Sequence, residues 1–107
     1  ETAAREGLTV VVVINCDYAW GMEELYMQKV AGTTVNVKQS EARYDQVARA
    51  LGGHGELIDT PDGIAPAIDR ALAADGPTVI QVVVDDRENV HPPGLDEFHG
   101  MYAAEHP

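Results

Sequence analysis

Two short apolar runs stand out from the pattern of hydrophobic and polar positions along the chain. One lies within Leu8–Asn15 and the other within Thr78–Asp85. Both are rich in β-branched residues and far too short to cross a bilayer, so they predict strands buried on both faces of a parallel sheet. Glu56–Asp59 predicts a third, shorter strand.

Two stretches between these strands have the spacing of amphipathic helices. The first, Ala42–Leu51, carries a stripe of Tyr44, Val47, Ala48 and Leu51 and ends in a glycine-rich turn in which His54 is expected to be a surface cap residue. The second begins at Thr60–Pro61, an expected N-cap and first-turn pair, and ends before Gly76–Pro77. Its inward stripe is expected to be Ile64, Ile68, Ala71 and Leu72.

The remaining segments have weaker patterns. Glu1–Gly7 resembles the last turns of a helix closed by a glycine, which suggests a piece of a longer chain. Met22–Val30 predicts one or two helical turns, followed by a loop with a short extended piece at Thr34–Val37. His91–Gly94 predicts a rigid turn, and Leu95–Ala104 a terminal helix.

Strands and helices therefore alternate along one domain of 107 residues. This alternation is typical of an α/β fold with right-handed crossovers, and we expect a three-layer α/β/α arrangement around a parallel sheet. The chain shows no internal repeat and no low-complexity tract.

Composition narrows the possible partners. Seven basic and eighteen acidic residues give a formal net charge of -11, which opposes binding to nucleic acid because few cations are available to contact phosphates. No stretch resembles a membrane span or a signal peptide, and the single Cys16 is typical of a reducing compartment, where we expect it to pack as a small buried group. We therefore expect a cytoplasmic protein.

The chemistry that the sequence suggests lies at the end of the first strand. Asn15 and Asp17 follow the apolar run, and Gly21 comes shortly after them. Ligands of open α/β sheets bind beyond the carboxyl ends of strands, and oxygen donors there can hold a divalent cation. The pattern favours a metal-phosphate site, although an aspartate that only makes a turn is the alternative interpretation of Asp17.

The order and spacing of these segments resemble the C-terminal cofactor-binding domain of thiamine diphosphate-dependent enzymes. The most similar branch comprises acetolactate synthases, sulfoacetaldehyde acetyltransferases and 2-oxo acid decarboxylases. The resemblance covers nearly the whole chain, and the segments that carry it are Thr2–Leu8, Val10–Met22, Ala48–Glu56, Pro61–Pro77, Val79–Asp85 and the tail from Pro92 to Tyr102.

The resemblance implies a magnesium ion that holds the diphosphate of the cofactor. In the family its ligands are an aspartate of a Gly-Asp-Gly motif, an Asn or Asp after the next strand, and a backbone carbonyl two residues on. Counting back from Trp20-Gly21-Met22 assigns the second ligand to Asp17 and the carbonyl to Ala19. Matching by residue identity gives the alternative, Asn15 with the carbonyl of Asp17.

Further roles follow from the same resemblance. Ala19, Trp20, Gly21 and Met22 match positions near the diphosphate, although Trp20 and Met22 could instead be core or domain-interface contacts. Glu23 falls where some decarboxylases of the family have an active-site glutamate and synthases have an apolar residue. Acidic residues are also favoured in the first turn of a helix by its dipole alone.

The Gly-Asp-Gly segment would precede residue 1, so the resemblance implies that residues 1–107 are the C-terminal part of a cofactor-binding domain. The parent would be a homo-oligomeric thiamine diphosphate- and Mg²⁺-dependent lyase or transferase, a decarboxylase or carboligase, acting on a 2-oxo acid or related acyl donor with its remaining domains. We expect the chain alone to bind the cofactor weakly or not at all and to be inactive.

In the family's sheet the strand at 78–85 lies between the other two. We therefore expect Thr78–Asp85 to be the most buried element and Leu8–Asn15 to have an unpaired edge. Such an edge invites self-association, or coverage by a rearranged terminus. A free-standing, non-catalytic α/β binding or regulatory module is the main alternative function. A flavodoxin-like sheet is less consistent with the sequence, because the loop after the first strand is acidic and bulky.

Overall fold

A computed structural model of the chain describes residues 1–85 together with Gly94, Glu97 and Gly100. These residues fall into two compact units. The first, here called the α/β unit, consists of Glu1–Asp17 and Glu41–Val84, and the second contains Tyr18–Ser40. Apart from the three residues just named, the expected turn at His91–Gly94 and helix at Leu95–Ala104 lie outside the described residues.

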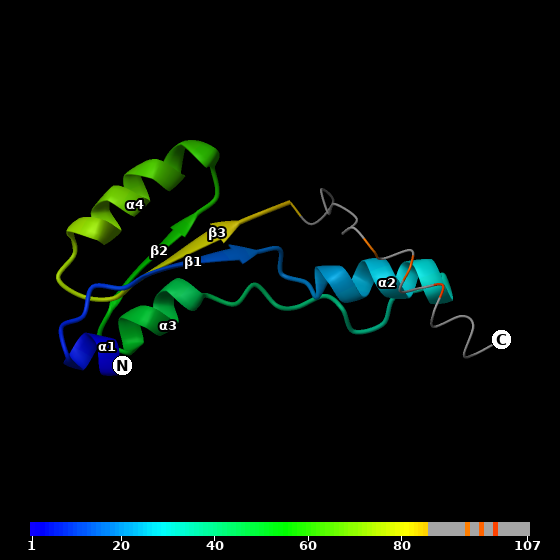
Figure 1. The fold of residues 1–107 in the computed structure, drawn as a ribbon, viewed down its shortest axis with the longest axis horizontal. Coiled ribbons are helices and arrows are strands. Elements are labelled where there is room, and N and C mark those ends of the chain that lie inside the picture. The colour runs from blue at the N-terminus through cyan, green and yellow to red at the C-terminus, as the bar shows by residue number, and fades with distance from the viewer. Residues whose placement is uncertain (86–93, 95–96, 98–99, 101–107) are drawn as a thin grey trace. The chain divides into compact units, whose positions relative to one another are not determined.

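The α/β unit contains a three-stranded parallel sheet (Figure 1). Its strand order is β1 (Val11–Cys16), β3 (Thr78–Val83), β2 (His54–Ile58), with Val11 and His54 both in register with Thr78. The central β3 is mostly buried, whereas β1 has only one buried residue. The α/β class, the position of β3 and its burial are therefore as the sequence predicts.

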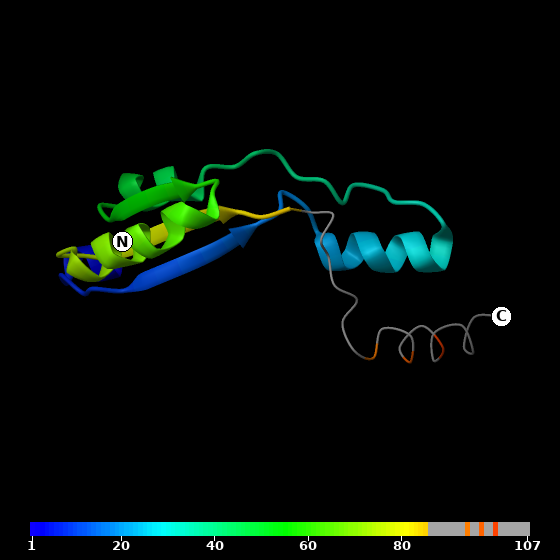
Figure 2. The ribbon, with the colours of Figure 1, turned by 90° about the horizontal axis from the view of Figure 1, so that it is seen from above.

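Helices cover both faces of this sheet (Figures 1 and 2). Successive residues of a strand point to opposite faces. On one face of β3, Ile80 and Val82 pack with Ile58 and with Ala67 and Ala71 of α4 (Ile64–Ala73). On the other face, Gln81 contacts α3 (Tyr44–Ala50), so the expected three layers are present.

Two of the expected helical stripes are partly wrong. Leu72, which was expected to face the sheet, is 64% exposed, and Ala67 packs against the sheet instead. In α3, Tyr44, Val47 and Leu51 are all at least 37% exposed, and the buried residue of the helix is Asp45. The cause is the surface that α3 meets, because β2 presents Gly55, which has no side chain, and β3 presents the polar Gln81.

The ends of the elements also differ in detail from the sequence prediction. Gly7 closes α1 (Thr2–Arg5) with a left-handed φ of 64°, as expected. Thr60, however, makes no side-chain capping bond, and Pro61–Gly63 forms a 3-10 turn, η1, before α4. His54 is the first residue of β2 rather than a cap, and its ring lies 3.3 Å from Asp75.

The second unit contains a longer helix than the sequence predicts. Helix α2 spans Gly21–Ala31, and Gly32 ends it in the left-handed conformation with φ 67°. No residue of α2 is fully buried, which is consistent with the poor apolar period of this segment. The expected extended piece at Thr34–Val37 is reduced to an isolated bridge between Ala19 and Lys38, next to the buried Val37.

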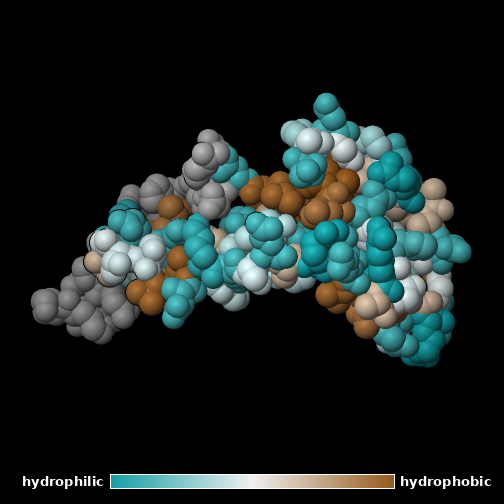
Figure 3. Space-filling view, turned by 180° about the vertical axis from the view of Figure 1, so that it is seen from behind, coloured by the Kyte–Doolittle hydropathy of each residue, from teal (hydrophilic) through white to brown (hydrophobic). Residues whose placement is uncertain are grey.

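The predicted burial of the first strand on both faces is wrong, because apolar side chains in β1 and just before it are open to solvent. Leu8, Val10, Val12 and Val13 are each at least 43% exposed. The view from behind shows hydrophobic surface of the α/β unit bordered by hydrophilic surface (Figure 3). Among the described residues, no helix has both the length and the apolar character that a bilayer crossing requires.

Candidate functional site

The candidate site begins where β1 ends. Cys16, the last residue of β1, is buried as predicted, and its carbonyl accepts a hydrogen bond of 3.1 Å from the amide of Val84. Asp17 follows directly and is half-buried. Because all three strands run in the same direction, Asp17 lies at the carboxyl edge of the sheet, where ligands of α/β folds bind.

The alternative ligand, Asn15, lies inside the strand. It is in register with Val82, one residue before the end of β1, and it is exposed. Asn15 is still paired within the sheet, whereas Asp17 follows the last paired residue of β1. The choice between Asn15 and Asp17 as the metal ligand stays a prediction.

Residues 18–20 run antiparallel to residues 37–39 in the second unit, and an isolated bridge between Ala19 and Lys38 joins them. The amide of Trp20 donates to the carbonyl of Val37 at 2.7 Å, and the amide of Gln39 donates to the carbonyl of Tyr18 at 2.8 Å. Ala19 lies between these bonds, opposite Lys38. In such an antiparallel pair the peptide groups of the middle residue face outward, so the carbonyl of Ala19 is directed away from residues 37–39.

Tyr18 adopts a positive φ of 52°, which is uncommon for a residue with a side chain. This conformation turns the chain between Asp17 and the bridged residue Ala19. The turn lies between the two residues that the sequence assigns to the metal, Asp17 and Ala19.

Trp20, Gly21 and Met22 form the beginning of α2. Trp20 is the N-cap, and its carbonyl accepts from the amide of Glu24 at 2.8 Å. Trp20 is 57% and Met22 53% exposed, so neither is a core contact within the described residues. A helix N-terminus presents amide groups and a partial positive charge, which favour an anionic ligand.

Two acidic side chains stand in the first turn of α2. Glu23 is exposed, whereas the carboxylate of Glu24 accepts a hydrogen bond of 2.8 Å from the Lys38 ammonium. Lys38 therefore balances one of the two charges that would otherwise oppose a phosphate at this helix end.

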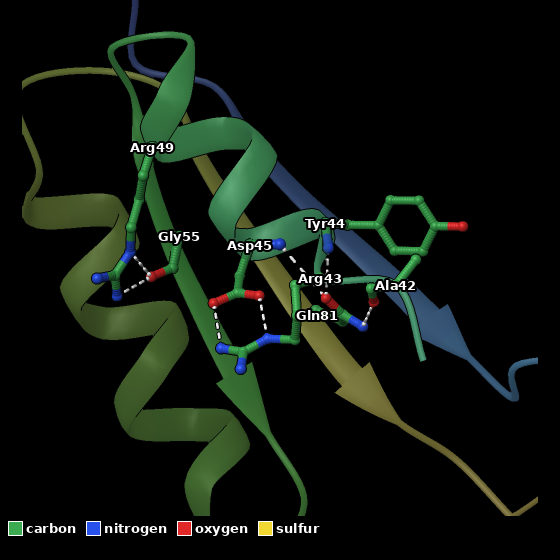
Figure 4. Close-up of polar contacts among 7 residues, drawn as sticks. All are labelled: Ala42, Arg43, Tyr44, Asp45, Arg49, Gly55 and Gln81. Atoms are coloured by element: carbon green, nitrogen blue, oxygen red, sulfur yellow. Dashed lines mark hydrogen bonds and ion pairs between the residues drawn. The ribbon is translucent and has the colours of Figure 1, made fainter. Parts of the chain in front are cut away.

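A polar network that the sequence did not predict lies beneath α3 (Figure 4). The side chain of Gln81 is bonded to Ala42, Tyr44 and Asp45, and the guanidinium of Arg43 makes two bonds of 2.8 Å to Asp45. The hydrogen bonds from Arg43 hold the pKa of the Asp45 carboxyl below its ordinary value, against the effect of burial. The available signal was a single glutamine inside an otherwise apolar strand.

The described residues contain no cluster of three or more His, Cys, Asp or Glu side chains that could hold a metal ion. The donors that the resemblance implies are one carboxylate, on Asp17, and one backbone carbonyl, on Ala19. Both are hard oxygen ligands of the kind that Mg²⁺ prefers. They would fill part of a Mg²⁺ coordination shell, and phosphate oxygens, waters and other protein groups would have to supply the remaining ligands.

Comparison with known proteins matches residues 1–82 to the family described as "Thiamine pyrophosphate enzyme, C-terminal TPP binding domain". A probable acetolactate synthase of Mycobacterium bovis is 41% identical over 86 residues, which are 79% of this chain and 16% of that protein. An acetolactate synthase isozyme 2 large subunit of Escherichia coli is 30% identical over 95 residues, which are 85% of this chain and 17% of that protein.

A 2-hydroxyacyl-CoA lyase of Arabidopsis thaliana is 28% identical over 91 residues, which are 79% of this chain and 16% of that protein. The chain thus spans about a sixth of the length of the curated relatives that it matches.

Proposed function

The chain belongs to the thiamine pyrophosphate (thiamine diphosphate) enzyme family, as part of the C-terminal cofactor-binding domain. From this membership we propose that it supplies one side of a Mg²⁺–thiamine diphosphate site in a larger enzyme of the acetolactate synthase type. The observation that carries the proposal is the position of Asp17, immediately after the parallel strand β1 and four residues before Gly21.

The residues that would hold the cofactor are contributed by the chain from Asp17 to Met22. The carboxylate of Asp17 and the carbonyl of Ala19 would bind Mg²⁺, and the backbone of Gly21 and Met22 at the start of α2 would lie against the diphosphate. The outward direction of the Ala19 carbonyl supports this assignment. The exposed side chain of Trp20 would contact the cofactor beside them.

When bound, thiamine diphosphate would stabilise the negative charge that develops as a 2-oxo acid loses CO₂. Glu23 is the residue of this chain that we propose to hold or deliver a proton near the substrate. Its exposure in the first turn of α2 leaves its carboxylate accessible. The 2-oxo acid substrate, the remaining domains and a homo-oligomeric assembly belong to the same proposal.

The chain by itself would hold only part of this site. Two oxygen ligands from the protein leave most of an octahedral Mg²⁺ shell to other groups. The isolated 107-residue chain is therefore expected to show little heat on titration with Mg²⁺ and thiamine diphosphate, and no release of CO₂ from a 2-oxo acid.

The complete enzyme that carries this segment tests the proposal. We expect it to release CO₂ from a 2-oxo acid only when both Mg²⁺ and thiamine diphosphate are present. Tight Mg²⁺-dependent binding by the isolated chain would mean that other groups form the site. Failure of the larger protein to bind thiamine diphosphate would instead support the alternative of a non-catalytic α/β binding or regulatory module.

A further inference from the structure

Gln81 is a fully buried polar residue in the central strand. Its side chain has no exposed surface, and it points from β3 toward the start of α3 (Figure 4). The amide oxygen accepts hydrogen bonds from the backbone amides of Tyr44, at 2.8 Å, and Asp45, at 3.3 Å. The amide nitrogen donates to the carbonyl of Ala42 at 2.8 Å. One side chain thus fixes three backbone groups within four residues.

This contact replaces the usual helix cap. The first amides of a helix have no partner within the helix and are normally bound by a side chain at the N-cap. The N-cap of α3 is Arg43, which makes no such bond. Its guanidinium instead holds Asp45, which is 2% exposed. The segment from Ala42 to Asp45 is therefore fastened to β3 through Gln81.

The hydrogen bonds of Gln81 hold the chain just after the point where it returns to the α/β unit. The chain leaves the α/β unit after Asp17, at the end of β1, and returns to it at Glu41. Gln81 lies beside Ile14 of β1 in register, three residues before Asp17. Both ends of the Tyr18–Ser40 segment are thus tied to neighbouring strands in the carboxyl half of the sheet, one by β1 and the other by Gln81.

We propose that Gln81 is a positioning residue for the cofactor site. By holding Ala42–Asp45 on β3, it fixes the return end of the segment that carries Ala19, Gly21 and Met22, and it does so without touching the cofactor. The structural part of this inference stands on the hydrogen bonds alone. Its consequence for cofactor binding rests on the proposed function.

Hydrogen exchange on the 107-residue chain tests the structural part. The variant Gln81→Met keeps the length of the side chain and removes its hydrogen bonds, while Ile80→Ala truncates a fully buried residue on the opposite face of β3. The informative amides are Trp20 and Gln39, which are bonded within the second unit and do not contact Gln81.

At denaturant concentrations that give the two variants equal global stability, Gln81→Met should exchange these two amides about tenfold faster than Ile80→Ala. Equal exchange of both amides in the two variants would overturn the inference. Gln81→Glu, which keeps the acceptor and loses the donor to Ala42, should fall between wild type and Gln81→Met.

Cofactor titration of the larger enzyme tests the consequence. Gln81→Met should raise the apparent Kd for thiamine diphosphate at fixed Mg²⁺ by about tenfold, while kcat at saturating cofactor stays within about twofold of wild type. Ile80→Ala should leave that Kd within about twofold. An unchanged Kd in Gln81→Met would refute the positioning role, whereas a wild-type enzyme that binds no cofactor would refute the proposed function and leave the exchange result to decide on Gln81.

Discussion

Replacing Gly55 by alanine should separate α3 from the sheet. A Cβ atom at this position would lie 2.0 Å from the carbonyl oxygen of Asp45 and 2.6 Å from its carbonyl carbon. Both are backbone atoms, so no side-chain rotation can relieve the overlap. The helix would have to retreat from β2 by at least about 1 Å to restore ordinary contact distances.

Such a shift affects contacts on both sides of Gly55. Overpacking of this kind typically costs about 1–3 kcal/mol. The retreat would also weaken the bonds from Gln81 to the amides of Tyr44 and Asp45 and those from Arg49 to the carbonyl of Gly55, at about 0.5–1.5 kcal/mol each. We expect a total loss of about 3–5 kcal/mol from a chain whose whole stability is roughly 5–15 kcal/mol.

Urea unfolding followed by circular dichroism measures this loss. Gly76→Ala is the matched control, because a Cβ there meets only the ring of His54, at 3.8 Å, and the residue does not have a positive φ. The control should unfold within about 1 kcal/mol of wild type. If Gly55→Ala is equally benign, the close approach of α3 to β2 is not a feature of the folded chain.

Three further predictions concern charge, association and catalysis. Because the folded-state pKa of Asp45 is low, its ion pair with Arg43 stabilises the fold at pH values above the ordinary pKa of 3.8, and this stability is lost as the pH falls through the lower, folded-state pKa. Arg43→Ala should cost about 1–2 kcal/mol at pH 7 and move the onset of acid unfolding, measured by fluorescence, to higher pH. An unchanged onset would contradict the pairing. The isolated chain should self-associate through the open edge of β1 in sedimentation experiments, and Val13→Lys should shift it toward monomer. Leu57→Lys should not, because Arg49 already covers the outward carbonyl of Gly55 on β2. A wild-type chain that sediments only as monomer would exclude this pairing. In the larger enzyme, Glu23→Gln should lower kcat for CO₂ release by about 10²-fold without changing the Kd for thiamine diphosphate, and an unaltered kcat would remove Glu23 from the chemistry.

The sheet could be predicted from the sequence because its signals are local. Continuous β-branched runs identify β1 and β3, and the resemblance gave the central position of β3. The inward face of α3 could not be read in the same way. Its apolar stripe suggests burial of Val47 and Leu51, but the helix approaches the sheet over Gly55 and Gln81, which come later in the chain.

The candidate site shows the same division. Asp17 was assigned from the family resemblance, by counting back from Trp20, and the structure has it directly after β1, while its role as a metal ligand stays a prediction. The orientation of the Ala19 carbonyl depends on the bridge between Ala19 and Lys38, which the local sequence pattern did not predict. The anchoring of Ala42 by Gln81 joins residues 39 positions apart, so it too required the fold.

Calorimetric titration of the larger enzyme with thiamine diphosphate in the presence of Mg²⁺, for Asp17→Ala and Asn15→Ala side by side, tests the metal assignment most directly. We predict that Asp17→Ala weakens Mg²⁺-dependent binding by at least about tenfold, that Asp17→Asn retains most of it, and that Asn15→Ala stays within about threefold of wild type. Wild-type binding by Asp17→Ala together with loss of binding in Asn15→Ala would contradict the account.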